Sequence, residues 1–130
     1  MSISTEALDQ LARSNKSADD IVEKLGNVLN EVVARLKPRI MIVAGSLARG
    51  TFVRRMSDID VLAVLGRKPG LYERFTLRAV EDHDVEITAL SVEDVKEALQ
   101  RGNQFVRDAL LHGILVYGRR RDLEDLITSR

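Results

Sequence analysis

The segment IDVLAVL, residues 59–65, is apolar at every position except Asp60. A strand with one wet face alternates polar and apolar side chains, whereas a strand covered on both faces is apolar almost throughout. The segment therefore predicts a strand that is buried on both sides. Such a strand restricts the chain to folds in which a sheet is packed against other elements.

Three other segments have strand patterns. Residues 39–44 (RIMIVA) form a short run rich in β-branched side chains, and residues 114–117 form a brief apolar run. Residues 84–90 (DVEITAL) alternate polar and apolar side chains, as a strand with one wet face does. We expect these segments to join residues 59–65 in one sheet.

Helices are predicted where apolar residues recur at a spacing of three and four. The clearest helix lies between Ser17, which resembles a capping pair with Asp20, and Pro38, whose ring disfavours helical geometry in the preceding residue. Ser91 and Asp94 form a second capping pair. Further helices are expected at residues 71–80, 91–101 and 104–112 and from residue 119 onward. Together these elements predict an α/β or α+β fold with helices on one side of a sheet.

Length and composition limit the classes of function. The 130 residues suffice for one domain, which we assign to residues 17–130, with residues 1–16 as an N-terminal arm or short helix. The formal net charge of zero argues against general attraction to nucleic acid or lipid. The absence of cysteine removes disulfides, thiolate zinc sites and cysteine nucleophiles. Without a signal peptide or a long apolar run, a cytoplasmic protein with no membrane partner is expected.

Two carboxylates, Asp58 and Asp60, lie at the entrance of the buried strand. Residues two apart on a strand point to the same face, so these side chains project together. At about 5–7 Å apart in a partly dry cleft, two unscreened negative charges would cost several kcal/mol. Either one carboxylate takes a proton or a divalent cation bridges the pair. Oxygen ligands suit Mg²⁺, with Mn²⁺ as a substitute.

An isolated Asp-x-Asp is more often a solvated strand end, but here three neighbouring features favour a site. Gly45 ends the strand at residues 39–44, and Ser46 is placed to cap a short helix, so the turn can bind an anion. Arg49 lies about one helical turn further on and can reach phosphate oxygens. The strand at residues 84–90 offers Asp84 and Glu86 on a single face. An anion cradle, a cation site and a third carboxylate are the parts that phosphoryl transfer requires.

The order of these motifs resembles the minimal nucleotidyltransferase family of the polymerase-beta superfamily. The motif G-S-x-A-R-G, residues 45–50, is followed by S-D-I-D, residues 57–60, and then by an apolar strand, with eleven residues between Ser46 and Asp58. The ending LLHGILVY, residues 110–117, is similar to the last helix and strand of that family. The resemblance covers residues 40–117 and implies a polymerase-beta-like fold, a mixed sheet with flanking helices.

The resemblance also implies a cofactor and a catalytic set. It implies two Mg²⁺ ions, for which Mn²⁺ can substitute, held by Asp58, Asp60 and a third carboxylate that also prepares the acceptor hydroxyl. Glu86 fits the third position best, because the family usually has an aspartate between apolar residues there, and Asp84 is the alternative. The implied substrate is ATP or another nucleoside triphosphate. The residues expected to bind it are Gly45, Ser46, Arg49 and Ser57.

Several functions remain open at this point. The first is an active transferase that moves AMP to an acceptor hydroxyl. Family members are often paired with a small helical HEPN partner protein, on which they act as antitoxins, although an aminoglycoside or a transfer RNA is also an acceptor in relatives. The alternative is a catalytically silent nucleotide-binding module that acts by binding a partner. Nucleic-acid binding through Arg119, Arg120 and Arg121 has weak support.

Two further expectations concern histidines and assembly. His83 and His112 are predicted to be packing or surface residues rather than bases. The apolar helix at residues 18–36 either covers the sheet or meets a second chain in a homodimer.

Overall fold

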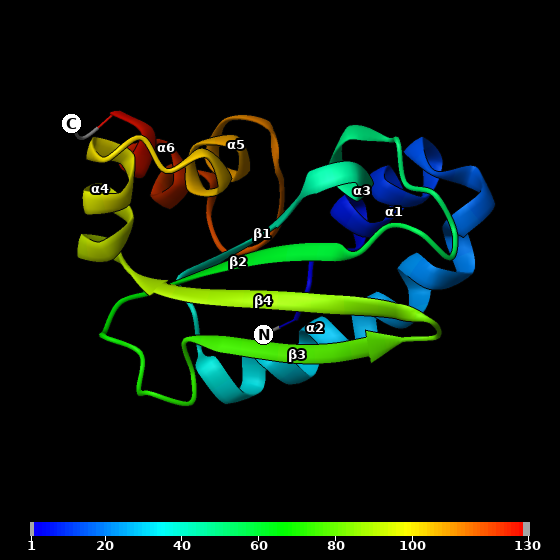
Figure 1. The fold of residues 1–130 in the computed structure, drawn as a ribbon, viewed down its shortest axis with the longest axis horizontal. Coiled ribbons are helices and arrows are strands. Elements are labelled where there is room, and N and C mark those ends of the chain that lie inside the picture. Colours follow the sequence, from blue (N-terminus) through cyan, green and yellow to red (C-terminus); the bar gives the residue numbers. More distant parts are fainter. Residues whose placement is uncertain (1, 129–130) are drawn as a thin grey trace.

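The computed structural model describes residues 2–128 and has a five-stranded mixed sheet in the order β3-β4-β2-β1-β5 (Figure 1). Its strands are β1 (Ile40–Ala44), β2 (Ile59–Leu65), β3 (Phe75–Val80), β4 (His83–Ser91) and β5 (Ile114–Tyr117). Strands β2 and β4 are parallel, and the other three neighbouring pairs are antiparallel. The predicted α/β class with a mixed sheet and flanking helices is confirmed.

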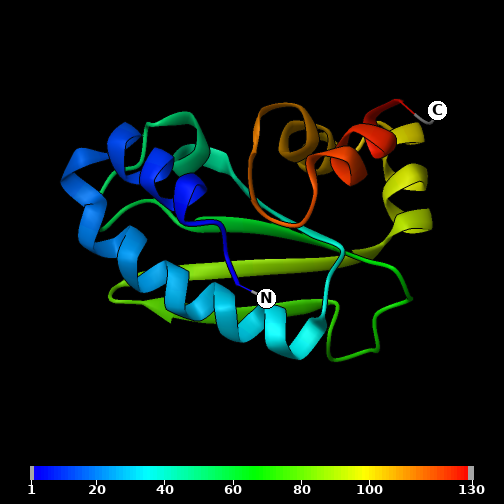
Figure 2. The same ribbon diagram turned by 180° about the vertical axis from the view of Figure 1, so that it is seen from behind.

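Helices cover both faces of this sheet. The helices are α1 (Thr5–Ser14), α2 (Asp19–Leu36), α3 (Gly45–Arg49), α4 (Val92–Gln100), α5 (Gln104–His112) and α6 (Arg120–Thr128), with a short 3₁₀ helix η1 (Lys16–Ala18) before α2. Figure 2 shows α2 along one face, and α5 and α6 with α4 on the other. The expectation of helices on one side is wrong, because the central strands are apolar on both faces and need cover on both.

Each face has its own hydrophobic core. On the first face, the apolar stripe of α2, including Leu25 and Leu29, packs against β2 and β4. On the second face, Ile42 and Leu62 pack against α4, α5 and α6. Every residue of β2 except Asp60 is buried, as its apolar sequence predicted.

The N-terminal segment belongs to the first core. Ile3, Ala7 and Leu11 are buried against α2 and β5. The N–H of Ser4 donates a hydrogen bond of 2.7 Å to the carbonyl oxygen of Val116 in β5. The start of the chain is therefore joined to the last strand of the sheet.

The prediction of a helix at residues 71–80 is wrong, because residues 75–80 form the edge strand β3. This strand pairs antiparallel with β4, so Phe75 lies opposite Thr88 and Leu77 opposite Glu86. Leu71, Phe75 and Ala79 recur at a spacing of four, which fits a helix, although residues 75–79 also alternate apolar and polar side chains as a strand does. The pairing partner that decides between the two lies downstream. The predictions for β2, α5 and β5 have the observed bounds.

Two of the three predicted helix caps are absent. Helix α2 follows η1 and has no side-chain cap, because Ser17 lies inside η1 and Asp20 binds Arg54 instead. The N-cap of α3 is Ala44, so Ser46 lies within that helix. The capping box of Ser91 and Asp94 at the start of α4 is confirmed. In residues 2–128, none of the helices has the length and apolarity that crossing a bilayer requires.

Candidate functional site

The glycine turn at the end of β1 contacts the first residues of β2. Ala44 pairs with Asp60, and the next residue, Gly45, has a positive φ of 69°. A Cβ atom added at Gly45 would lie 2.8 Å from Oδ2 of Asp60. A side chain at this position would therefore be strained and would collide with the carboxylate, so only glycine fits.

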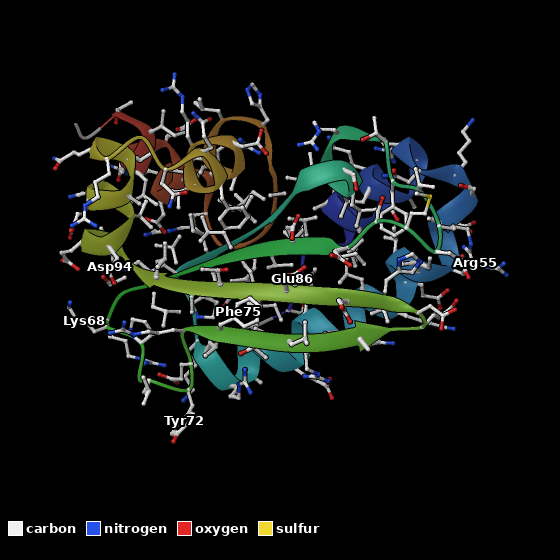
Figure 3. All side chains as sticks on the ribbon, viewed as in Figure 1. Arg55, Lys68, Tyr72, Phe75, Glu86 and Asp94 are labelled. Carbon is white, nitrogen blue, oxygen red and sulfur yellow. The ribbon has the colours of Figure 1, made fainter. Side chains whose placement is uncertain are left out.

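The parallel pairing of β2 and β4 brings Asp60 and Glu86 together. These two residues are direct register partners, whereas Asp84 is exposed and lies two residues before Glu86, opposite Ala79 of β3. Asp58 immediately precedes β2. Of the two candidates for the third carboxylate, Glu86 is the one placed opposite Asp60. Figure 3 shows Glu86 on the part of the sheet, over β3 and β4, that α4, α5 and α6 leave uncovered.

The electrostatics of the site reflect this crowding. Burial raises the pKa of Asp60, the negative charge of Asp58 raises it further, and the positive charge of Arg49 opposes both effects. Burial also raises the pKa of Glu86, followed by a hydrogen bond with Asp58 and by the charges of Asp60, Asp58 and Asp84. Protons are therefore held more tightly at Asp60 and Glu86 than at free carboxyl groups.

The donor set fits a hard divalent cation. Three carboxylates supply the oxygen ligands that Mg²⁺ and Mn²⁺ prefer, and a cation could replace the proton in the Asp58–Glu86 hydrogen bond. Within residues 2–128, however, no three acidic or histidine side chains already form a closed metal-binding group. Ion binding would thus require a rearrangement of side chains on a backbone that already places Asp60 opposite Glu86.

The other predicted site residues lie nearby but already have partners. Arg49, at the end of α3, lies 3.4 Å from Asp108 of α5, and about half of its side chain is exposed. The carbonyl oxygen of Ser46 accepts a hydrogen bond of 2.9 Å from the Thr51 N–H. The hydroxyl oxygen of Ser57 accepts a hydrogen bond of 3.0 Å from the Val53 N–H. Of these residues, Arg49 is the one whose charge acts on Asp60.

The loop of residues 50–58 joins α3 to β2 and is bound by two buried side chains. Asn15, at the end of α1, accepts a hydrogen bond from Phe52 N–H, and His83, the first residue of β4, bonds to Arg55 and Ser57. His83 is buried and packs on Phe52, and His112 is exposed, so both fit the expectation of packing or surface residues. The contribution of Asn15 was not predicted, because no local pattern links it to a loop 37 residues away.

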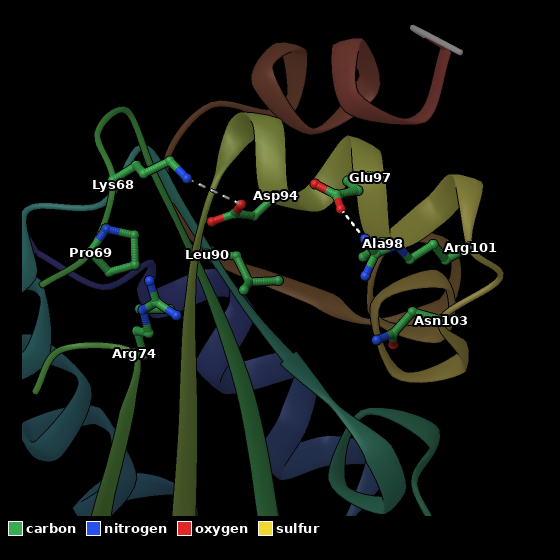
Figure 4. Close-up of a pocket in the computed structure, with 10 residues that line it drawn as sticks. Lys68, Pro69, Arg74, Leu90, Asp94, Glu97, Ala98, Arg101 and Asn103 are labelled. Atoms are coloured by element: carbon green, nitrogen blue, oxygen red, sulfur yellow. Dashed lines mark ion pairs between the residues drawn. The ribbon is translucent and has the colours of Figure 1, made fainter. Parts of the chain in front are cut away.

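Beside Glu86, the sheet face over β3 and β4 is open. Phe75 and Leu77, both on this face, are 54% and 57% exposed. At the far end of β4 lies a cavity of about 370 Å³ (Figure 4). Lys68, Arg74, Leu90, Asp94 and Arg101 are among its lining residues, which do not include Asp58, Asp60 or Glu86. Lys68 pairs with Asp94 at 4.0 Å across its rim.

Comparison with known proteins places this sequence in a family. The sequence profile of the nucleotidyltransferase domain matches residues 25–117, which is more than half of the chain. A search of curated proteins found no significant match. Among solved structures, the chain is similar to a crystal structure of a proposed nucleotidyltransferase from Sulfolobus solfataricus, with 23% identity and a TM-score of 0.44 over 91% of this chain and 92% of that one. On the strength of the profile match, the chain belongs to the nucleotidyltransferase domain family.

Proposed function

We propose that the protein is a Mg²⁺-dependent minimal nucleotidyltransferase that transfers AMP from ATP to a hydroxyl group of an acceptor. The observation that carries this proposal is the register of β2 and β4, which sets Glu86 opposite Asp60, with Gly45 against the Asp60 carboxylate. Three carboxylates and a turn without a side chain are thereby collected from three segments of the chain. The family match supports a transferase, while the metal, the nucleotide and the acceptor are part of the proposal.

The residues divide the reaction between them. Asp58 and Asp60 would hold the Mg²⁺ ions, which supply positive charge to the triphosphate oxygens. The backbone at Gly45 and Ser46, with Arg49, would bind the terminal phosphates. The acceptor oxygen forms a bond to the α-phosphorus, the bond from that phosphorus to the bridging oxygen breaks, and pyrophosphate leaves. Glu86, which lies opposite Asp60, would help to hold the second ion and would accept the proton of the acceptor hydroxyl.

The acceptor in this proposal is a hydroxyl group on a small helical HEPN partner protein, and the transferase acts as its antitoxin. The support is the open face beside Glu86, where Phe75 and Leu77 are exposed next to the third carboxylate. Exposed apolar residues beside a reacting group suit a macromolecular acceptor better than a small polar one. In residues 2–128, the helices cover the sheet without forming a separate domain that could hold the acceptor.

Transfer of label from ATP tests the proposal. Purified protein is incubated with Mg²⁺, with ATP labelled at the α-phosphate, and with a small helical HEPN protein as acceptor. We expect labelled partner and released pyrophosphate, and loss of both with Asp58→Asn or Asp60→Asn. Asp9→Asn, an exposed carboxylate on α1, serves as the matched control and should label normally.

Two results would reject the assignment. Labelling that survives both substitutions at Asp58 and Asp60 would show that these carboxylates do not bind the catalytic ions. Calorimetry that detects ATP binding, without pyrophosphate release when the partner is offered, would favour the silent nucleotide-binding module instead.

A further inference from the structure

Three polar residues are buried among the described residues: Asn15, His83 and Ser91. Ser91 caps α4 and so has a local structural task. Asn15 and His83, in contrast, come from different elements and both bind the backbone of the loop at residues 50–58. Buried polar groups have to be hydrogen-bonded, so the partners that they bind are held in place.

Asn15 binds the beginning of this loop. Its Nδ2 donates to the carbonyl oxygens of Leu11 at 2.9 Å and of Leu47, in α3, at 2.8 Å. Its Oδ1 accepts from the Phe52 N–H at 3.3 Å. One amide therefore connects the end of α1, the helix that follows Gly45, and the third residue of the loop.

His83 binds the end of the loop. Its Nε2 accepts from the Arg55 N–H at 3.3 Å, so the proton of the neutral ring is on Nδ1, which donates to the carbonyl oxygen of Ser57 at 2.7 Å. Arg55 has a positive φ of 70°, a backbone conformation that residues other than glycine rarely adopt without support from neighbouring contacts. The imidazole holds this strained residue and the residue immediately before Asp58.

The two anchors are joined to each other and to the catalytic strands. The rings of Phe52 and His83 contact at a centroid distance of 4.8 Å. His83 also begins β4, three residues before Glu86, so the same residue determines where the loop meets the strand of the third carboxylate. The separation of Asp58 from Glu86 therefore depends on the hydrogen bonds of the imidazole.

We propose that Asn15 and His83 are positioning residues, a two-point clamp that sets the glycine turn, Asp58 and Glu86 at the separation that metal-bound nucleotide requires. This inference rests on the proposed function. It extends the catalytic unit to α1, because Asn15 lies outside residues 25–117, the region that matches the family profile. The clamp acts through the backbone and does not touch the substrate.

The test measures the affinity of the full chain for Mn²⁺-ATP by calorimetry, with Mn²⁺ binding followed separately by its paramagnetic resonance signal. We expect Asn15→Ala and His83→Leu to weaken Mn²⁺-ATP binding by about 10-fold to 100-fold, the range for residues that orient metal ligands. His83→Asn, which keeps a donor where Nδ1 lies, should recover part of the loss. Hydrogen exchange of the Phe52 and Arg55 amides should accelerate in the variant that removes each acceptor.

Leu126→Ala is the control for a general loss of stability, because Leu126 lies on α6 and is buried in the other core. It should lower the melting temperature and leave Mn²⁺-ATP affinity unchanged at a temperature where every variant is folded. The clamp is rejected if wild type binds Mn²⁺-ATP and the Asn15 and His83 variants bind as tightly as Leu126→Ala. Failure of the proposed function is a different result, namely a wild-type protein that does not bind Mn²⁺-ATP at all.

Discussion

Two loops of nine residues each flank the central strand β2 in the sequence, and different kinds of contact hold them in place. Residues 50–58 precede β2 and are bound by the buried side chains of Asn15 and His83. Residues 66–74 follow β2 and are held by the exposed ion pair of Arg67 and Glu73, at 2.8 Å. The first loop leads to the carboxylates. The second displays Tyr72, which is 91% exposed.

This difference shows where the fold requires one backbone conformation. A buried hydrogen bond loses its energy with small displacements and has no competing water, so it fixes the backbone narrowly. An exposed ion pair contributes little and tolerates movement. We conclude that the backbone of the first loop is fixed in one conformation, whereas the second loop can move while it contacts solvent or a partner.

The largest expected effect on stability comes from replacing Asn15, which binds the first loop. Asn15→Ala removes the partner of Phe52 N–H and of two carbonyl groups in a buried position, so we expect the free energy of unfolding to fall by about 2–4 kcal/mol. Chemical denaturation measures this change. Asn27→Ala, at an exposed position of α2, is the matched control and should change stability by no more than about 0.5 kcal/mol. Equal effects of the two substitutions would remove the distinction between the loops.

A second comparison uses Gly45, at the start of the helix that leads to the first loop, and Gly70, inside the second loop. Gly45→Ala forces a side chain into a positive φ and toward Asp60, and we expect it to cost about 1–3 kcal/mol and to weaken Mn²⁺-ATP binding. At Gly70, a Cβ would meet Glu73 Oε1 at 3.3 Å, the end of a flexible side chain. Gly70→Ala should therefore be close to neutral in the same denaturation and binding measurements. A neutral Gly45→Ala would contradict the close approach to Asp60.

The two regions should also respond to pH with opposite sign. Burial and repulsion raise the pKa of Glu86 above 4.5, so its contribution to stability is present below that value and is lost as the pH rises through the raised pKa. The hydrogen bond from Arg67 lowers the pKa of Glu73 from 4.5 to about 2, so its contribution is present above 4.5 and is lost as the pH falls toward about 2. The same measurement, melting temperature against pH, reads out both groups.

In metal-free buffer near neutral pH, Glu86→Gln should raise the melting temperature by a few degrees, on the order expected for removing a repulsive charge. Glu73→Gln should leave it unchanged or slightly lower, because the exposed pair is screened by solvent. Added Mg²⁺ should stabilise wild type more than Glu86→Gln. A lower melting temperature for metal-free Glu86→Gln would show that the carboxylate is stabilising without an ion.

The smallest effect on stability is expected in the second loop. Tyr72→Ser removes a side chain that is almost fully exposed, so we expect a change within about 0.5 kcal/mol and normal Mn²⁺-ATP binding. If the open face and this loop receive the acceptor protein, the same substitution should reduce labelling of the partner. Normal labelling would separate this loop from acceptor binding and leave the rest of the site intact.

The sequence predicted those parts of the fold that depend on local pattern. β2 was located because it is apolar at every position except Asp60, and α4 because the Ser91–Asp94 box marks its start. The edge strand β3 was predicted as a helix, because the apolar residues of this segment fit a helical spacing as well as a strand spacing and the pairing with β4 decides between them. Ser17 failed as a cap because η1 replaces the expected first turn of α2.

The residues of the candidate site also divide into those that a local sequence pattern indicates and those that only the structure reveals. Asp58, Asp60 and Gly45 could be proposed as site residues because the motif places them within a short stretch of sequence, and Glu86 because its strand alternates clearly. The register that places Glu86, and not Asp84, opposite Asp60 needed the structure, since a shift of pairing by two residues would exchange them. Asn15 and His83 could not be recognised, because their hydrogen-bond partners lie 37 and 26 residues away in the chain.

The hydrogen bond between Ser4 and Val116 has a consequence for synthesis of the protein. During translation β1 leaves the ribosome long before β5, which is its second neighbour in the sheet. The first residues of the chain also pair with β5. The sheet therefore cannot be completed until residue 117 has left the ribosome. A nascent chain that stops before that point still exposes the apolar edge of β1. We expect chaperones to bind nascent chains of this protein until β5 has emerged from the ribosome.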